Sequence, residues 1–231
     1  MGISPKRALC RFMAKRGYLK KNAHCQREWY GNKYGGYYVN PSLLNSDSIV
    51  YSFGIGEDIS FDQTIGEKHN SHIFGFDPTP KALAWIEKQI LPEKFRFTQA
   101  ALGQKSGTAE FHLPKNPDHV SGSLSEQNNV NLLEKISVEV KSFKDIVLEY
   151  GHRHIDILKI DVEGTEYDIM EGILNSGVTI GQILIEFHDR LYPDGQQKTK
   201  DTVSLLKKHG YEIFGVDALC EVVSFIRKDL I

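Results

Sequence analysis

The amino-acid sequence predicts an α/β domain with a mostly parallel sheet, and three observations support this class. From residue 48 onward, segments typical of strands alternate with segments typical of helices at the spacing of β-α-β units. Residues 155–162 form an aliphatic run typical of a central strand that is covered on both faces. Residues 211–216 and 221–227 are two strand segments with no helix between them, which predicts a closing hairpin.

The individual elements follow from hydrophobic periodicity and from the turn residues along the chain. We expect strands near residues 48–53, 72–77, 95–100, 155–160, 182–187, 211–216 and 221–227. We expect helices near residues 59–69, 79–90, 142–150, 165–175 and 197–209. Two short additional strands, near 107–113 and 136–141, flank a polar stretch from His119 to Asn131. Residues 18–42 are rich in Tyr, Gly and Asn, which predicts loops or a hairpin.

The first 40 residues carry an excess of positive charge. They hold nine of the 28 basic residues and one of the 30 acidic residues, which leaves 19 basic and 29 acidic residues for the rest. We therefore predict a basic, aromatic-rich extension over residues 1–45 and a main domain over residues 46–231. The basic groups suit a solvated helix face, an anionic acceptor or an acidic membrane surface. Nucleic acid is a weaker candidate, because no recognised binding module surrounds the aromatic residues.

Composition excludes several other classes of protein. Hydrophobic residues make up 40% of the chain and charged residues 25%, as in ordinary globular domains. Cys10, Cys25 and Cys220 are widely spaced, which predicts neither a disulfide framework nor a zinc site. No apolar run approaches the roughly 20 residues that span a bilayer, and the N-terminus lacks the apolar core of a signal peptide. We expect a cytoplasmic or intracellular protein, with peripheral membrane association as an option.

A glycine-containing turn follows the first predicted strand, within the segment Val50–Asp58. Gly54 and Gly56 allow a tight turn and a close approach to a ligand, and the next helix offers amide donors. An ordinary strand-to-helix turn explains the two glycines equally well. Asp77 ends the next strand 23 residues after Gly54, near the spacing that places a carboxylate on a ribose diol. The alternative is that Asp77 or Thr79 caps the following helix.

Together, the glycine turn and Asp77 favour a nucleoside ligand over a dinucleotide. The dinucleotide fingerprint has a third glycine or alanine at the position of Ile59. A dinucleotide fold also has a second mononucleotide-binding half, whereas this chain closes with a hairpin. A nicotinamide-dependent oxidoreductase stands as an alternative hypothesis, although the missing third glycine counts against it. A non-catalytic nucleotide-binding or scaffold protein is a further alternative.

Acidic residues end the central strand. Asp161 and Glu163 precede Gly164, at the edge of the sheet where open α/β folds bind ligands. Carboxylates are costly to bury unless they contact something, so both are candidates for chemistry. The alternative for Glu163 and Glu166 is that their charge matches the dipole of the following helix.

The neighbouring strand ends in a second polar group, formed by Glu186, His188 and Asp189. These side chains and Asp161 offer a general base for proton removal. The same chemistry suits a divalent metal ion, with carboxylate oxygens as hard ligands and an imidazole as a softer one. For such an ion we name Asp161, Glu186 and His188 as ligands. A structural histidine is the alternative for His188.

Four segments of the chain occur in the order seen in one known family. They are Asp77, Gln99–Gly103, Leu158–Glu166 and Ile185–His188. Over residues 46–227 the chain resembles the FkbM-type S-adenosylmethionine (SAM) methyltransferases. This resemblance implies the Rossmann-like class I methyltransferase fold, with a mostly parallel seven-stranded sheet and an antiparallel last strand. It also implies methyl transfer from SAM, in this family mostly to oxygen atoms of sugars and natural products.

The resemblance also implies roles for individual residues. The implied cofactor-binding residues are Gly54, Gly56, Asp77, Ala100, Ala101 and Asp161. Asp77 would hold the ribose, and the small Ala100–Ala101 pair would admit the flat adenine ring, although close strand packing explains that pair too. From the chemistry of proton removal, and not from the resemblance, we name Asp161, Glu163 and His188 as the catalytic residues. Ser52 departs from the family, which usually has an acid there, so that Glu57, Asp58 or Asp62 would have to replace it.

The expected acceptor is a carbohydrate hydroxyl, free or carried on a lipid or a protein. Since a sugar hydroxyl is a weak acid, a base or a metal ion should help to remove its proton. Ser121–Ser125 lies in the polar stretch, where it would either cover the acceptor or form a solvated loop. Together with these residues, the resemblance predicts a SAM-dependent O-methyltransferase.

Overall fold

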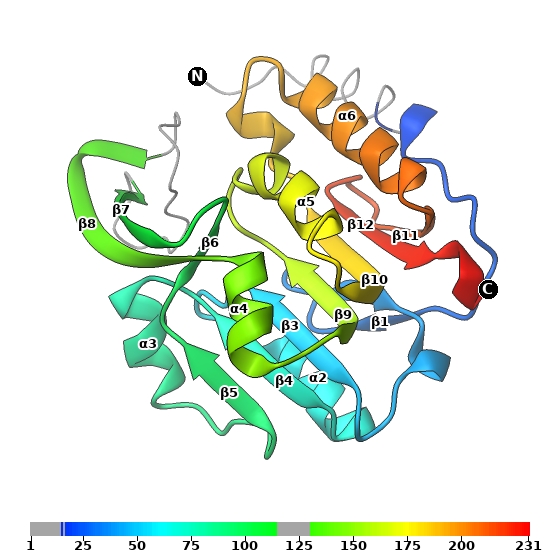
Figure 1. Cartoon of the computed structure of the whole chain (residues 1–231), viewed down its shortest axis with the longest axis horizontal. Coiled ribbons are helices and arrows are strands. Elements are labelled where there is room, and N and C mark those ends of the chain that lie inside the picture. The colour runs from blue at the N-terminus through cyan, green and yellow to red at the C-terminus, as the bar shows by residue number, and fades with distance from the viewer. Residues whose placement is uncertain (1–14, 16, 115–129) are drawn as a thin grey trace.

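The computed structural model describes residues 15, 17–114 and 130–231. Within these residues the main sheet has seven strands in the order β11-β12-β10-β9-β3-β4-β5 (Figure 1). The strands are β3 (Ile49–Phe53), β4 (His72–Phe76), β5 (Phe95–Thr98), β9 (His154–Ile160), β10 (Thr179–Glu186), β11 (Tyr211–Val216) and β12 (Val222–Arg227). The last strand, β12, runs antiparallel to both of its neighbours, whereas the pairs from β10 to β5 are parallel. The predicted Rossmann-like sheet and its antiparallel last strand are confirmed.

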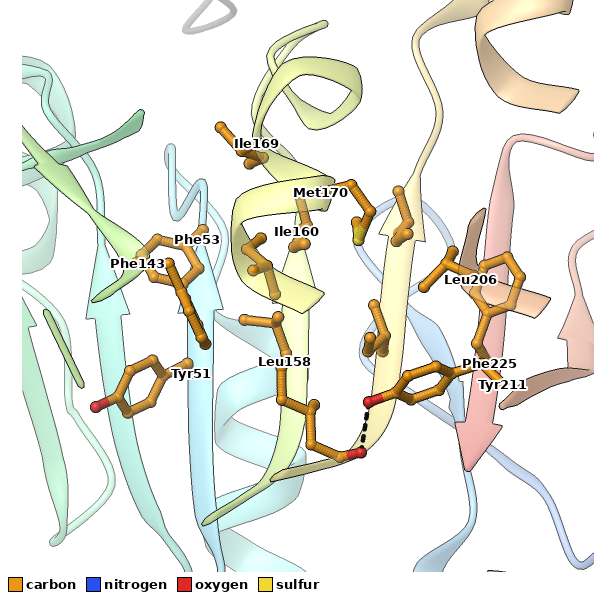
Figure 2. Packing of buried hydrophobic residues seen from close by; sticks show 14 of the residues in the cluster. Tyr51, Phe53, Phe143, Leu158, Ile160, Ile169, Met170, Leu206, Tyr211 and Phe225 are labelled. Carbon is orange, nitrogen blue, oxygen red and sulfur yellow. Dashed lines mark hydrogen bonds between the residues drawn. The ribbon is translucent and has the colours of Figure 1, made fainter. Parts of the chain in front are cut away.

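Helices α4, α5 and α6 cover one face of the sheet (Figure 1). The helices of the chain are α2 (Ser60–His69), α3 (Pro80–Ile86), α4 (Phe143–Tyr150), α5 (Glu166–Leu174) and α6 (Gly195–Lys208), with short 3-10 turns at Pro41–Leu43, Asp189–Leu191 and Lys228–Leu230. Leu158 and Ile160 of β9 pack with Met170 of α5 in this core (Figure 2). Because side chains alternate along a strand, Ile157 belongs to the core on the other face.

The second face is covered by α2 together with an N-terminal hairpin. The hairpin consists of β1 (Glu28–Tyr30) and β2 (Tyr37–Val39), which confirms the hairpin expected within residues 18–42. Tyr30 and Tyr37 are buried in the same core as Ile157 and Phe61. The boundary between residues 1–45 and 46–231 stays a prediction, but this hairpin packs directly on the main sheet.

Two elements end earlier than the sequence predicted. The helix expected at 79–90 ends at Ile86, because its last amides bond three residues back, as in Gln89 N to Ile86 O at 3.0 Å. The strand expected at 95–100 ends at Thr98, whose carbonyl accepts from Ala100 N at 3.0 Å in a tight turn. That turn removes the chain from the main sheet.

A smaller sheet then follows, with the order β6-β8-β7. Its strands are β6 (Ala101–Gly103), β7 (Gly107–Pro114) and β8 (Val130–Ser142), and the last two contain the short strands expected at 107–113 and 136–141. Ser121–Ser125 and the basic residues Lys6, Arg7, Arg11 and Arg16 lie outside the described residues. In the part of the chain that is described, no helix is long and apolar enough to cross a membrane.

Candidate active site

A cavity of about 410 Å³ opens where strands β3, β4, β9 and β10 end. Carboxyl ends of parallel strands meet at one edge of a sheet, so residues far apart in sequence come together there. The predicted residues that line this cavity are Gly54, Gly56, Asp77, Ala100, Ala101, Asp161, Glu163 and Glu186. His188 is buried behind the lining, 3.6 Å from Asp161 Oδ1.

The glycine turn lies between the ends of the two strands that neighbour β3, namely β4 and β9. Gly54 has a φ angle of +81°, which favours glycine. A Cβ atom at Gly54 would lie 1.7 Å from the carbonyl oxygen of Asp161. The Gly54 amide donates to Phe76 O at 2.9 Å, so the turn is held from both sides. A glycine is therefore required at position 54, because a side chain there would collide with the backbone of Asp161.

Asp77 fastens the glycine turn to the start of α3. Its Oδ2 accepts from the amide of Gly56 at 2.9 Å, and its Oδ1 accepts from Thr79 N at 2.9 Å and Thr79 Oγ1 at 2.7 Å. Thr79 is the N-cap of α3, with its hydroxyl accepting from Ala82 N. A carboxylate offers about four acceptor positions, so one remains for a ligand hydroxyl. The capping and ligand-binding hypotheses for Asp77 are therefore compatible.

The three acids considered as replacements for the residue at Ser52 lie in different places. Glu57 and Asp58 line the cavity, whereas Asp62 of α2 is buried and is not among the lining residues. Burial raises the pKa of Asp62 to about 6, against the opposing effect of Lys159. Asp62 is thus not exposed to a ligand.

Lys159 is a buried residue that the sequence reasoning missed. Its Nζ donates to the carbonyl oxygen of Gly54 at 2.7 Å and lies 5.6 Å from the centre of the Tyr37 ring. Tyr37 Oη in turn donates to Asp161 Oδ2 at 3.4 Å. Burial and then Asp161 raise the pKa of Tyr37 well above its usual value. A lysine within an aliphatic strand was the available signal, since a buried ammonium needs partners.

On the other side of the cavity, acids surround one imidazole. His188 Nε2 lies 3.6 Å from Asp161 Oδ1, 3.5 Å from Glu163 Oε2 and 3.7 Å from Glu186 Oε1. These distances are longer than hydrogen bonds. We call Asp161, Glu163, Glu186 and His188 the carboxylate side, and Gly54, Gly56 and Asp77 the glycine side.

Glu166 anchors His188 from behind. One oxygen, Oε1, accepts from the amide of His188 at 2.8 Å and lies 3.3 Å from its Nδ1. The other, Oε2, accepts from Gly164 N at 2.8 Å. Glu166 is 0% exposed. It is the first residue of α5, where the sequence suggested a charge that matches the helix dipole, and its contacts show that it also links two loops.

Neighbouring charges change the pKa values of two groups on the carboxylate side. Burial alone would lower the pKa of His188, but the surrounding carboxylates, Glu166 first, outweigh burial and raise the pKa to about 10. Burial, followed by repulsion from Asp161, raises the pKa of Glu186 to about 7. The surrounding carboxylates therefore favour the protonated form of the imidazole, whose charge balances part of theirs.

The sequence profile of the methyltransferase FkbM domain matches residues 29–213, which is most of the chain. The chain belongs to the FkbM methyltransferase family. The resemblance predicted from the sequence is confirmed, and with it a SAM-dependent methyltransferase of class I fold. The hypotheses of a nicotinamide-dependent oxidoreductase and of a scaffold protein are set aside.

Two of the relatives of this FkbM methyltransferase are named as methyltransferases. A 2-O-methyltransferase, NoeI, from Sinorhizobium fredii is 26% identical over 180 residues, which cover 71% of this chain and 74% of NoeI. The human probable methyltransferase-like protein 24 is 23% identical over 148 residues, 63% of this chain and 34% of that protein.

This FkbM methyltransferase is also similar to solved structures, at TM-scores below 0.5. An rRNA methylase from Streptococcus thermophilus gives a TM-score of 0.46 and 12% identity over 80% of this chain and 90% of that chain. Aeropyrum pernix fibrillarin, solved with bound S-adenosyl-L-methionine, gives 0.45 and 12% identity over 90% of this chain and 85% of that chain.

The cavity of this FkbM methyltransferase fits the cofactor of its family. Its volume of about 410 Å³ lies in the usual range of small-molecule sites. At Gly54, where a side chain would collide with Asp161, the bare backbone borders the cavity. Ala100 and Ala101 add two small side chains to the lining, which also includes Phe76. These residues would hold SAM, and SAM when bound supplies a methyl group on a sulfonium.

The N-terminal hairpin also contributes to the cavity of this FkbM methyltransferase, which the sequence reasoning did not predict. Tyr34 and Gly35 line its rim. Their loop is fastened to the main domain because Asn32 Nδ2 donates to Asp58 Oδ2 at 2.7 Å. Gly35 packs so closely that a Cβ atom would lie 2.4 Å from Asp58 Oδ2. The hairpin is therefore part of the site.

Proposed function

We propose that this methyltransferase transfers the methyl group of SAM to a hydroxyl of a carbohydrate, either free or carried on a lipid or a protein. The observation that supports this proposal best is the contact between the two sides of the cavity. Gly54 of the glycine side packs on the backbone of Asp161, the first acid of the carboxylate side. A cofactor held by the glycine turn would therefore have proton-accepting groups beside it.

On the glycine side the chain would bind and orient SAM. In this proposal Asp77 accepts a hydrogen bond from a ribose hydroxyl, since one acceptor position of its carboxylate is available beyond the bonds to Gly56 and Thr79. Glu57 and Asp58 line the cavity beyond the turn, where either acid suits the amino group of the methionine end. Orientation of the two reactants alone can contribute roughly 7–11 kcal/mol to the rate.

On the carboxylate side the chain would hold the acceptor and remove its proton. We propose that Asp161 removes this proton, because this acid borders both the glycine turn and the cavity. Glu163 would accept a hydrogen bond from the acceptor. His188 would contact Asp161 from behind, with Nε2 3.6 Å from Asp161 Oδ1.

The rim of the cavity is consistent with a carbohydrate acceptor. Arg190 and Glu186 line it and offer hydrogen-bonding partners for hydroxyl groups. Tyr34 also lines the cavity and is 85% exposed, so its ring offers a flat apolar surface. The name of the relative NoeI, a 2-O-methyltransferase, supports oxygen as the methyl acceptor.

The basic N-terminal residues suggest a contact with an anionic acceptor or an acidic lipid surface. Nine basic residues within residues 1–40 support this, at about 1 kcal/mol for each basic group near such a surface. Lys15 is already used, because its Nζ lies 2.9 Å from Asp189 Oδ1.

The proposed function is tested in two steps. Calorimetry with SAM and with its demethylated product should show binding of both, and absence of both would contradict the cofactor assignment. A panel of glycans and small metabolites incubated with isotopically labelled SAM should then give a labelled O-methyl carbohydrate by mass spectrometry. Label on nitrogen, or on non-carbohydrate acceptors alone, would contradict the acceptor class.

A further inference from the structure

The carboxylate side concentrates negative charge around a single buried ring. Four carboxylates lie within 3.7 Å of a nitrogen of His188, namely those of Asp161, Glu163, Glu166 and Glu186. Arg190 is farther out, with NH1 3.9 Å from Glu186 Oε1. Since carboxylates removed from water need a cation or hydrogen-bond donors, this arrangement favours an additional positive charge.

The imidazole is oriented as a ligand would be. Glu166 lies on the Nδ1 side at 3.3 Å and also accepts from the backbone amide of His188. Nε2 points toward Asp161 and Glu186 and has no hydrogen-bond partner among the described residues, although His188 is only 1% exposed. A histidine with one nitrogen held by a carboxylate and the other directed into acids is the usual arrangement at metal sites.

The candidate ligand atoms are close enough to share one ion. One atom from each of Asp161, Glu186 and His188 can be chosen so that all lie within 4.8 Å of one another. Metal–ligand bonds of roughly 2.0–2.3 Å place ligand atoms up to about 4.5 Å apart, so shifts of a few tenths of an ångström suffice. Asp161 and Glu186 also line the cavity, so the ion would reach a bound acceptor.

We propose that Asp161, Glu186 and His188 bind a divalent cation and that Glu166 is a positioning residue for His188. Two carboxylates and an imidazole suit Mn²⁺ better than Mg²⁺, which prefers oxygen ligands. Binding releases the imidazole proton, as for any histidine ligand. The role of the ion rests on the proposed function: it would hold the acceptor oxygen and polarise its O–H bond, and the proton would pass to the oxygen of Asp161 that does not bind the ion.

The direct test is a titration of the whole chain with Mn²⁺, followed by electron paramagnetic resonance of the free ion. We expect one ion per chain. Glu166→Gln should weaken Mn²⁺ binding roughly 10- to 100-fold, and His188→Ala and Glu186→Gln should weaken it at least as much. SAM affinity, measured by calorimetry on the same samples, should stay within about threefold for Glu166→Gln, since a collapsed site would lower both affinities.

The matched control is Glu221→Gln. Glu221 Oε1 lies 3.8 Å from Arg190 NH1, so this acid is close to the site but is not a proposed ligand. We expect wild-type Mn²⁺ affinity for this variant. The proposed-ligand variant Glu186→Gln should keep the fold, because Glu186 is partly exposed. An unchanged melting temperature would check this.

Each failure has a separate meaning. If wild type binds SAM but no Mn²⁺ at millimolar concentration, or if Glu221→Gln weakens Mn²⁺ binding as much as Glu186→Gln, the cation site is wrong while the proposed function stands. If Mn²⁺ binds at one ion per chain but SAM does not bind, the cation site stands and the proposed function is wrong.

Discussion

The glycine side and the carboxylate side of the cavity use their polar groups differently. On the glycine side, both oxygens of Asp77 already accept hydrogen bonds from backbone amides of Gly56 and Thr79. On the carboxylate side, Nε2 of His188 lies 3.5 to 3.7 Å from three acids without a hydrogen bond. One side is therefore rigid and suited to hold a cofactor, whereas the other keeps groups available for chemistry.

This difference makes a general prediction about variants. Changes on the glycine side should lower stability and SAM affinity, because they disturb backbone that is held by internal bonds. Changes on the carboxylate side should lower turnover, because they alter groups that meet the acceptor. A variant that shows the opposite pattern would break the comparison.

Gly54→Ala should have the largest effect. The new methyl group would meet Asp161 O at 1.7 Å, at a φ angle of +81°. Steric clash and backbone strain together should cost on the order of 4 kcal/mol in the free energy of unfolding. Urea denaturation measures this loss, and calorimetry should detect no SAM binding.

Gly177→Ala is the matched control for Gly54→Ala. Gly177 has nearly the same φ, +80°, but a Cβ atom there would have no neighbour within 4 Å. It should cost only about 1–2 kcal/mol, the strain of a left-handed residue. Equal losses for the two variants would show that the close approach to Asp161 is unimportant.

Asp161→Asn should have the second-largest effect, a loss of turnover. Removal of a general base typically lowers turnover by roughly 10²- to 10⁴-fold. Steady-state kinetics at saturating SAM should show this fall in kcat, while SAM affinity stays within about tenfold. Full turnover in the variant would mean that the proton is removed elsewhere, and Glu221→Gln serves again as the control acid.

Asp77→Ala should weaken SAM binding moderately. Hydrogen bonds to charged groups contribute roughly 1.5–3 kcal/mol, which corresponds to about 10- to 100-fold in Kd. At saturating SAM, kcat should remain near wild type. In the control variant Thr79→Ala, loss of the N-cap should cost about 1 kcal/mol of stability with a much smaller change in Kd. Unchanged SAM affinity in Asp77→Ala would reject the ribose assignment.

The smallest expected effect concerns Asp62 and pH. Burial raises its pKa from the ordinary 3.8 to about 6, so the folded chain holds this proton more tightly than the unfolded chain. Stability contributed by the protonated form is therefore lost as pH rises through this range. Between pH 5 and 7, wild type should lose about 1 kcal/mol relative to Asp62→Asn. Urea denaturation at pH 5, 6 and 7 measures the difference, and parallel curves would contradict it.

Much of the site could be predicted from local sequence. Gly54 and Asp77 follow strands, and Asp161 and Glu186 end strands that lie side by side in the sheet. Since the carboxyl ends of parallel strands meet at one edge, recognising the strands was sufficient to bring these residues together. The aliphatic run before Asp161 predicted the central strand of the sheet. The missing helix between β11 and β12 predicted the antiparallel hairpin that closes it.

Tertiary structure alone decided how the site is supported. Glu166 and His188 are 22 residues apart, and the buried carboxylate of Glu166 joins them. In the sequence alone, Glu166 resembles an ordinary acid at the start of a helix. Lys159 reaches Gly54 O across 105 residues, and the loop of Tyr34 reaches the cavity because Asn32 binds Asp58. Sequence periodicity gives the face of a strand or helix on which a residue lies. The partner that a buried polar group finds depends on which distant segments pack there, and only the folded chain determines that.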